Sequence, residues 1–290
     1  MAQTFGDFEL IISDNASSDR TPEICQAFAQ QDNRIRYVRS AENLGGAPNF
    51  NRVFALARGE YFKWAAHDDL IAPTFLERCV ATLDANPGAV VAHSWTQIID
   101  AKGHLGQRYG YDGRLTTDSP DPVSRFRSLI HPSHQCYQLF GLMRANILRQ
   151  TPLHGSYSHG DGVLLARLAL WGPFCELPEL LFFARSHPEQ TLYRFIWSQK
   201  RPDYYALTLW CDPTQAQQLI TPRWTILREY WRAIADSPLS PPERRDCYHE
   251  TWKWARTYWK GLLRDLGHAM VYRWKFRARG SGPVSVPNLV

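Results

Sequence analysis

The sequence lacks the patterns that mark membrane-spanning, secreted and cysteine-rich proteins. No apolar run reaches the length of about 18 residues that an ordinary transmembrane helix needs. The first residues do not show the basic-then-apolar order of a secretory signal. The six cysteines are spread along the chain without a C-x-x-C pair, so neither a zinc motif nor a disulfide framework is indicated. We therefore expect a cytoplasmic protein in a reducing compartment.

Strong charge is also lacking. The net charge of +5 in 290 residues is small, and no lysine-arginine cluster lies on a recognised nucleic-acid fold, so we expect no nucleic-acid partner. A hydrophobic share of 44% and a charged share of 21% exclude disorder for most of the chain. The length suggests one large domain or two ordinary ones.

Short strands alternate with helices in the first third of the chain. The predicted strands are Phe8–Ser13, Ile35–Val38, Tyr61–Ala65 and Ala89–Ser94, and the predicted helices are Thr21–Gln31, Pro48–Arg58 and Pro73–Asn86. This order predicts βαβ units in a parallel, Rossmann-like α/β sheet with helices on both faces, and Thr21 is expected to cap its helix. Ligands of such folds bind beyond the carboxyl ends of the strands.

Acidic residues follow two of these strands. Asp14–Asp19 comes after the first strand, and His67–Asp69 comes after the third. Two acidic clusters at one edge of a sheet would suit a divalent cation, Mg²⁺ or Mn²⁺, and a diphosphate. The same residue types also form ordinary turns and helix caps, so a purely structural interpretation stays open.

Three segments carry a family likeness. They are QTFGDFELIISDNASSDRT, NLGGAPNFNRVFALARGEYFKWAAHDDLIAP and HGDGVLLARLALWGPFCELPELLFFARSHP. In this order they resemble the family 2 glycosyltransferases with the GT-A fold, over roughly Ala2 to Pro188. The resemblance implies a GT-A domain over residues 1–190, followed by a mainly helical region over 191–279. Residues 280–290 have the composition of a disordered tail.

The resemblance assigns nucleotide contacts. By position, Asp14 would accept a hydrogen bond from the base, with Asn15 at the family's second acidic position. Asp19 closes the same turn, and Asn43 opens a stretch that resembles the family's N-x-G loop, where glycines allow close backbone approach. We expect all four to contact the nucleotide.

The family's D-x-D element falls on Ala66–Asp69. Because Ala66 replaces the first acid, the resemblance leaves Asp68 as the metal ligand and Asp69 as a second ligand or a ribose contact. His187, in a stretch similar to the family's R-x-H, is a third candidate for the metal or the diphosphate. The implied cofactor is Mg²⁺ or Mn²⁺.

The family's general base is an acid at the start of a helix on the acceptor side. Asp161 occupies that place, and Gly160 replaces the glutamate that commonly precedes it. One carboxylate suffices to take the proton of an acceptor hydroxyl. The alternative is that Asp161 only caps the helix that follows.

The chain starts at residues that would follow the first strand and helix of the family. From the resemblance we expect that this strand and helix are missing, and that the start was assigned at an internal methionine. Their loss would remove one wall of the base pocket and would put activity in doubt.

The carboxy-terminal third holds the positive charge. Between Thr221 and Gly280, 13 lysines and arginines face 6 aspartates and glutamates. Ser240 and Glu243 form a capping box that predicts a helix to about Leu266. Helical spacing aligns two stripes, an aromatic and apolar one (Tyr248, Trp252, Ala255, Trp259, Leu262 and Leu266) and a basic one (Lys253, Arg256, Lys260 and Arg264). Both a helix on an anionic membrane surface, which would make the protein peripheral on the inner face of the membrane, and a core helix fit this pattern.

The leading hypothesis is an inverting, metal-assisted hexosyltransferase. It would use a UDP-, GDP- or dTDP-sugar and a glycan or lipid-linked acceptor in the synthesis of a cell-envelope polysaccharide or glycolipid. One alternative is a catalytically impaired binding or scaffold protein with the same fold. A nucleotidyltransferase fits less well, because no glycine-rich loop with a basic residue is visible near the start.

Overall fold

The structure, a computed structural model, describes residues 2–111, 113–191, 193–197, 204–217 and 220–278. The expected tail at 280–290 lies outside these ranges. The strands are β1 (Leu10–Asp14), β2 (Ile35–Arg39), β3 (Tyr61–Phe62), β4 (Leu70–Ile71), β5 (Val91–Ile99), β6 (Leu105–Tyr109), β7 (Leu142–Arg144) and β8 (Phe174–Arg185). The α-helices are α1 (Thr21–Gln31), α2 (Gly46–Leu56), α3 (Phe75–Ala85), α4 (Pro122–Ile130), α5 (Ala145–Leu148), α6 (Gly160–Ala169), α7 (Tyr204–Cys211), α8 (Pro222–Asp236), α9 (Pro241–Thr257) and α10 (Trp259–Ala278). Short 3₁₀ or π segments are η1 (Tyr137–Phe140), η2 (Tyr193–Trp197) and η3 (Pro213–Gln217).

The first βαβ unit forms as predicted. Strands β1 and β2 pair in parallel, with Leu10 opposite Ile35, and α1 has the predicted bounds. The predicted cap is wrong, because Thr21 is the first helical residue and its N–H donates to Asp19 Oδ1 at 3.0 Å. The carboxylate of Asp19 therefore satisfies one of the free N–H groups at the start of α1.

The remaining strands form a mixed sheet, so the expectation of a parallel sheet is wrong for this part. Its order is β3-β7-β5-β8-β4, with β6 on β5. Strand β5 runs parallel to β8, whereas the other pairs are antiparallel. The missed strands β4, β6 and β7 are two to five residues long and carry no extended apolar run. Short strands of this kind give no clear periodicity in a single sequence.

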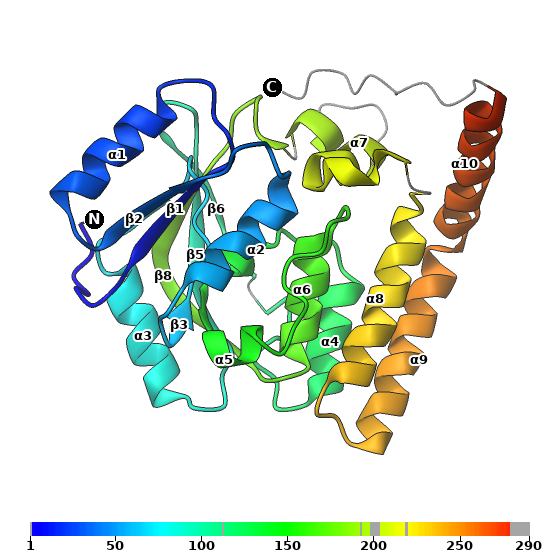
Figure 1. Ribbon diagram of the computed structural model, residues 1–290. Coiled ribbons are helices and arrows are strands. Elements are labelled where there is room, and N and C mark those ends of the chain that lie inside the picture. Colours follow the sequence, from blue (N-terminus) through cyan, green and yellow to red (C-terminus); the bar gives the residue numbers. More distant parts are fainter. Residues whose placement is uncertain (1, 112, 192, 198–203, 218–219, 279–290) are drawn as a thin grey trace.

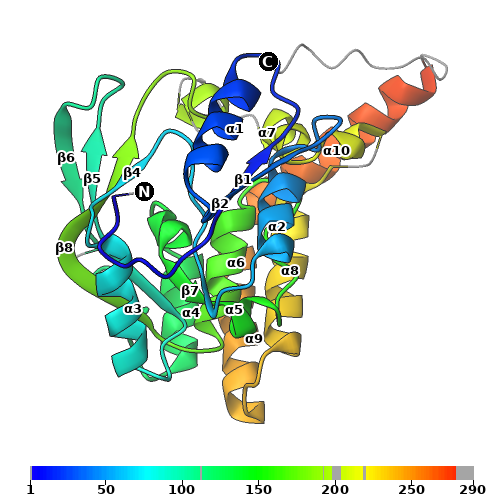
Figure 2. The same ribbon diagram turned by 60° about the vertical axis from the view of Figure 1, so that its left-hand side comes forward.

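Helices cover both faces of the mixed sheet, as predicted. On one face, Phe75, Cys79 and Leu83 of α3 pack against β5, β7 and β8 in one hydrophobic cluster. On the other face, α4 and α6 pack in a second cluster that includes Phe126 and Leu164. Figures 1 and 2 show these helices on opposite sides of the strands. The fold is thus mixed α/β with a helical carboxy-terminal region.

The carboxy-terminal helices share the second cluster. Tyr230 and Ile234 of α8 and Trp254 of α9 are buried in it, and Figure 1 shows α8 and α9 side by side along α4 and α6. Helices α8 and α9 thus pack on the amino-terminal part, whereas the proposed domain boundary at 190 stays a prediction.

The capping box is confirmed, but the helix it starts is shorter than predicted. The Ser240 N–H donates to Glu243 Oε2 at 2.8 Å. Helix α9 ends at Thr257 and α10 begins at Trp259, so the chain does not run as one helix to Leu266. The break at Tyr258 changes which side chains share a face.

The buried face of α9 is formed by Cys247, Glu250, Thr251 and Trp254. The core interpretation of the aromatic stripe is therefore wrong for Trp252 and Trp259, which are 64% and 51% exposed. Among the described residues, no helix combines the length and the apolar character needed to cross a membrane.

Buried His93 on β5 makes folding sensitive to acid. Its side chain packs edge-on against Tyr111, and burial lowers the pKa of His93 to about 4 from the usual 6.5. The neutral form contributes stability above pH 6.5, and this contribution is lost as the pH falls towards 4. We expect a loss of about 3 kcal/mol in unfolding free energy over that interval.

Denaturant titrations between pH 7 and 4 test this prediction. In a His93→Gln variant the pH slope of the unfolding free energy should be smaller, whatever its absolute stability. Equal slopes in the variant and the natural protein would contradict the prediction.

Candidate active site

Asp14 ends β1 in a buried position, with 3% of its surface exposed. Tyr37 Oη donates to its carboxylate at 2.6 Å, the Ser17 N–H donates at 2.8 Å, and Arg39 Nε lies 3.2 Å away. Burial alone would raise the pKa of Asp14, but the hydrogen bonds from Tyr37 and Ser17 and the charge of Arg39 outweigh it, so the pKa is lowered. Asp14 is thus an oriented carboxylate at the carboxyl end of a strand.

Asn15 and Asn43 join the two loops beside Asp14. Asn15 Nδ2 donates to Asn43 Oδ1 at 2.8 Å, and Asn15 Oδ1 accepts from the Leu44 N–H at 2.8 Å. The next residue, Gly45, has φ +88°, and a Cβ there would lie 2.6 Å from Pro213 Cδ. We expected the backbone at these glycines to allow a close approach. In the structure, the segment that approaches Gly45 closely is the one that joins α7 and η3.

Asp68 and His187 face each other in the structure. Asp68 Oδ2 lies 2.9 Å from His187 Nε2, although 119 residues separate them in the chain. The neighbouring Asp69 Oδ1 accepts from the Arg185 N–H at 2.9 Å, and the Arg185 side chain donates to the Asp68 carbonyl. Burial raises the pKa of Asp69 to about 6. Arg185, at the end of β8, therefore holds the loop that carries both acids.

These residues fit a divalent cation. Asp68 and His187 converge from one carboxylate and one imidazole, and both side chains are partly exposed, at 17% and 21%. Mg²⁺ and Mn²⁺ sites of this kind use one or two protein carboxylates and take further oxygens from substrate phosphates and water. Asp69 contributes only if its second oxygen turns to the same ion.

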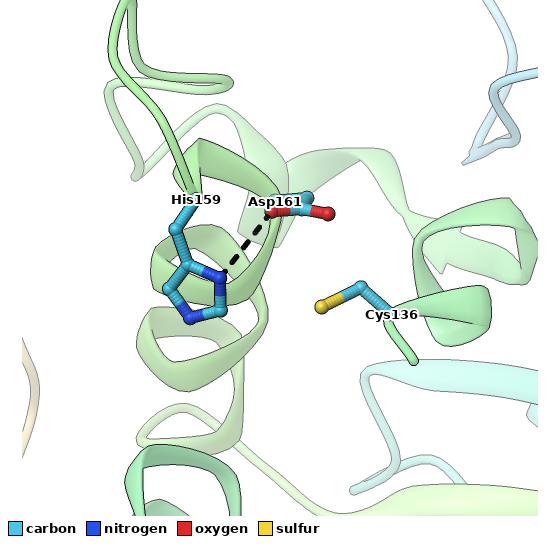
Figure 3. Close-up of side chains that lie close together, drawn as sticks. All are labelled: Cys136, His159 and Asp161. Atoms are coloured by element: carbon cyan, nitrogen blue, oxygen red, sulfur yellow. Dashed lines mark ion pairs between the residues drawn. The ribbon is translucent and has the colours of Figure 1, made fainter. Parts of the chain in front are cut away.

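Asp161 lies at the start of α6. The residue preceding this helix is His159, whose φ of 66° is left-handed, so Asp161 is a first-turn residue and not the N-cap. Asp161 Oδ1 accepts from the Gly162 N–H at 2.8 Å and lies 3.9 Å from His159 Nδ1, and the Cys136 sulfur lies nearby, within 4.8 Å of a carboxylate oxygen (Figure 3).

The surroundings of Asp161 favour its ionised form. Burial raises the pKa of Asp161, but His159, His154, the Gly162 N–H and the Cys136 thiol outweigh it, so the pKa is lowered. The side chain is still 31% exposed. It can therefore meet a substrate hydroxyl as a carboxylate at neutral pH.

Helix α2 connects the surroundings of Asp14 and Asp161. At its first turns, Ser13 Oγ donates to Asn49 Oδ1 at 2.7 Å, which fixes the end of β1. Half a turn further, Asn51 Oδ1 accepts from the His154 N–H at 3.0 Å, and Asn51 Nδ2 donates to the His154 carbonyl at 2.9 Å. The two asparagines thus hold the Asp14 strand and the loop before Asp161 on one helix.

A hollow of about 220 Å³ lies beside the end of β8 that carries Arg185. It is lined by residues of β5, β6 and β8, of the start of η1 and of the segments before η1 and after β8, among them Tyr109, Gln135, Tyr137, Arg185 and Gln190. Arg185 is the residue that donates hydrogen bonds to the Asp69 carboxylate and the Asp68 carbonyl. Gln135 and Tyr137 flank Cys136 in the chain, and the Cys136 sulfur lies within 4.8 Å of an Asp161 carboxylate oxygen. Ser186, which precedes the predicted ligand His187, also lines the hollow.

The sequence prediction missed several of these partners. Tyr37 and Arg39 lie two residues apart on β2, so their side chains share one face of the strand and can both point towards Asp14. This two-residue spacing was a signal in the sequence that could have been used. Cys136 and Arg185 gave no such signal, because each meets its acid only through tertiary contacts. The predicted pair Asp68 and His187 was brought together.

Comparison with known proteins identifies the family. The model of the family described as glycosyl transferase family 2 matches residues 1–151. The chain belongs to glycosyl transferase family 2.

Individual relatives of this family 2 chain are distant. An uncharacterised glycosyltransferase of Methanocaldococcus jannaschii is 31% identical over 36% of this chain and 36% of its own length. Glycosyltransferase GlyG of Streptococcus pneumoniae is 30% identical over 39% of this chain and 33% of its own length. An uncharacterised glycosyltransferase of Haemophilus influenzae is 26% identical over 65% and 59%, respectively. The chain thus spans between a third and three fifths of these curated relatives.

Solved structures confirm the fold. TarS 1-349 of S. aureus in complex with UDP-GlcNAc superposes with a TM-score of 0.60 at 14% identity, covering 92% of this chain and 74% of TarS. The same protein without that ligand gives a TM-score of 0.57 at 17% identity. The expected GT-A architecture of this family 2 chain is therefore confirmed.

Proposed function

We propose that the protein transfers a hexose from a nucleotide diphosphate sugar to an acceptor hydroxyl, with inversion at the sugar carbon. The observation that carries this proposal is the pair of Asp68 and His187, whose facing atoms lie 2.9 Å apart in the loop that Arg185 holds. Arg185 also lines the hollow, together with Gln135 and Tyr137. A sugar placed there would have its diphosphate near the cation ligands, and the ionised carboxylate of Asp161 would act on its acceptor.

Each group has a separate role in this proposal. Asp14 would accept a hydrogen bond from the imide N–H of a uracil or thymine base. Its carboxylate is held in a fixed orientation and lies at the carboxyl end of a strand, where ligands of such folds bind. Asn15, Asp19 and Asn43 would support the nucleotide loops. Asp68, with His187 and Asp69, would hold the Mg²⁺ or Mn²⁺ that neutralises the diphosphate when bound. Asp161 would take the acceptor proton.

A donor panel tests the activity. UDP-, GDP- and dTDP-sugars are incubated with the full chain and Mn²⁺ or Mg²⁺, and release of the nucleotide is measured with and without glycan and lipid-linked acceptors. TarS, a member of the same fold class, binds UDP-GlcNAc, so this donor belongs in the panel. A folded protein that neither binds nor turns over any donor would refute the proposal.

A binding protein with the same fold is the second candidate. Ala66, where the family carries an acid, favours it because one oxygen ligand is lost. Calorimetry with UDP in the presence and absence of Mn²⁺ separates the candidates, because a transferase of this type should bind the nucleotide more tightly with the metal.

We propose further that α9 and α10 bind an anionic membrane surface, where a glycolipid or a polysaccharide precursor would be met. Trp252 and Trp259 are largely exposed, and Trp231 of α8 is 50% exposed beside Tyr248, with ring centroids 6.1 Å apart. The basic residues Lys253, Arg256, Lys260 and Arg264 are all exposed on the same two helices. Tryptophan at the headgroup level with lysine and arginine beside it is typical of interfacial helices.

Point substitutions test the membrane contact better than deletion, because α9 carries core residues. We expect Trp252→Ser with Trp259→Ser to weaken the affinity for phosphatidylglycerol vesicles in cosedimentation about thirtyfold, since each of the two substitutions would remove roughly 1 kcal/mol of apolar burial. Leu105→Ser, which removes an apolar side chain that is 72% exposed on β6, is the matched control. Equal binding of the double variant and the control would refute the contact.

A further inference from the structure

Three different metal-ligating side chains meet at the start of α6. The Cys136 sulfur, a ring nitrogen of His159 and a carboxylate oxygen of Asp161 all lie within 4.8 Å of one another (Figure 3). They come from two segments, because Cys136 immediately precedes η1 whereas the other two flank the first residue of α6. The cluster is open to solvent, since the side chains of His159 and Asp161 are 42% and 31% exposed.

The two glycines around Asp161 make room for imidazole rings. A Cβ on Gly162 would lie 2.3 Å from the His159 ring, and a Cβ on Gly160 would lie 2.6 Å from the Gly155 carbonyl and 3.1 Å from the His154 ring. Any side chain at either position would therefore displace its neighbours. The Gly-Asp-Gly sequence, which departs from the family's acidic pair, thus fits a site in which His159 stands beside the aspartate.

The chemistry of the three ligands selects the ion. Thiolate, imidazole and one carboxylate form a set typical of Zn²⁺, whereas Mg²⁺ prefers oxygen ligands alone. Zinc lies about 2.3 Å from sulfur and about 2.0 to 2.2 Å from nitrogen or oxygen, so small side-chain rotations bring the three atoms onto one ion. Water or a substrate oxygen would complete the tetrahedron.

We propose that Cys136, His159 and Asp161 form a binding site for Zn²⁺ or a similar thiophilic cation, separate from the Asp68 and His187 site. In the bound state Asp161 coordinates the ion and cannot accept an acceptor proton. Zinc therefore inhibits sugar transfer reversibly, a consequence that rests on the proposed function of Asp161. Mn²⁺ and Mg²⁺ leave the cluster free, because they compete weakly for a thiolate.

Cobalt absorption tests the site without any transfer assay. Co²⁺ added to the full chain should give a thiolate-to-cobalt charge-transfer band, and Zn²⁺ should displace it with one ion per chain. The band should disappear in Cys136→Ser and persist in Cys175→Ser, the matched cysteine control on β8. His159→Ala should weaken Zn²⁺ binding at least about tenfold, the loss expected for one ligand. No band in the natural protein, or an equal band in Cys136→Ser, would overturn the site.

Inhibition is then measured at saturating Mn²⁺, relative to the rate of each variant without zinc. Micromolar Zn²⁺ should inhibit the natural protein and Cys175→Ser, and the inhibition constant should rise at least about tenfold in Cys136→Ser. Equal inhibition of Cys136→Ser would place the inhibitory ion elsewhere and overturn this consequence. A cobalt band in a protein without transfer activity would refute the proposed function and leave the zinc site standing.

Discussion

Asp161→Asn is expected to lower kcat by about 10²- to 10⁴-fold, the range that general base catalysis contributes. The amide has nearly the same shape, and its oxygen can still accept from the Gly162 N–H, which lies 2.8 Å from the present carboxylate. It cannot take a proton from an acceptor hydroxyl. Because the proposal gives Asp161 no part in holding the donor or its cation, the dissociation constant of the donor should stay within about twofold.

The measurement combines kinetics with calorimetry. The value of kcat is taken at saturating donor and acceptor, and donor binding is measured with Mn²⁺ but without acceptor. Asp246→Asn, on α9, is the matched control, because this carboxylate is 53% exposed and pairs with Arg245 on the surface. An unchanged kcat, or a loss of donor binding as large as the loss of kcat, would contradict the role of Asp161.

We expect Asp161 to be able to act as a base throughout the neutral pH range. His159, His154, the Gly162 N–H and the Cys136 thiol together hold the pKa of Asp161 below its usual value against the effect of burial. The carboxylate is therefore deprotonated near pH 7, and a decline of kcat towards acid should begin only below the usual range of an aspartate.

Local patterns in the sequence predicted the parts of the fold that local physics determines. The helix Thr21–Gln31 and the Ser240–Glu243 capping box depend on residues within one or two turns, and both were predicted. The antiparallel strands β4, β6 and β7 depend on pairing with distant strands, because their own sequences are too short to show a period. Pairing between strands that are distant in the chain is the feature of the fold that is hardest to predict from a single sequence.

The same division holds at the site. Asp14, Asp68 and Asp161 were predicted from the order of family motifs, and the structure places them at the end of β1, in the loop before β4 and in the first turn of α6. The neighbours that set the charge of these acids were not predicted. Cys136, for example, lies beside Asp161 but comes from another segment of the chain. The helix break at Tyr258 was also missed, because the heptad-like spacing of aromatic residues continues through it. The exposure of Trp252 and Trp259 follows from the packing of the other face of α9.

Asp68→Ala is expected to remove the metal-dependent part of donor binding. Asp68 Oδ2 faces His187 Nε2 at 2.9 Å, so the variant loses the one carboxylate oxygen that converges with an imidazole in this loop. The neighbouring Asp69 is already engaged, because its Oδ1 accepts from the Arg185 N–H at 2.9 Å. A cation held by His187 alone would bind weakly, and the diphosphate would lose its counter-charge.

Titration of the best-bound nucleotide of the panel, with and without Mn²⁺, measures this effect. In the natural protein Mn²⁺ should tighten binding, and in Asp68→Ala the two affinities should agree within about twofold, a loss of at least tenfold in the presence of the metal. Asp246→Ala should keep the full metal effect, and thermal unfolding of both variants checks that they fold. An undiminished Mn²⁺ effect in Asp68→Ala would move the cation to other ligands. Asp68 would then not be the residue responsible for metal-dependent donor binding. The assignment of proton transfer to Asp161 would have to be tested separately, in the presence of bound donor.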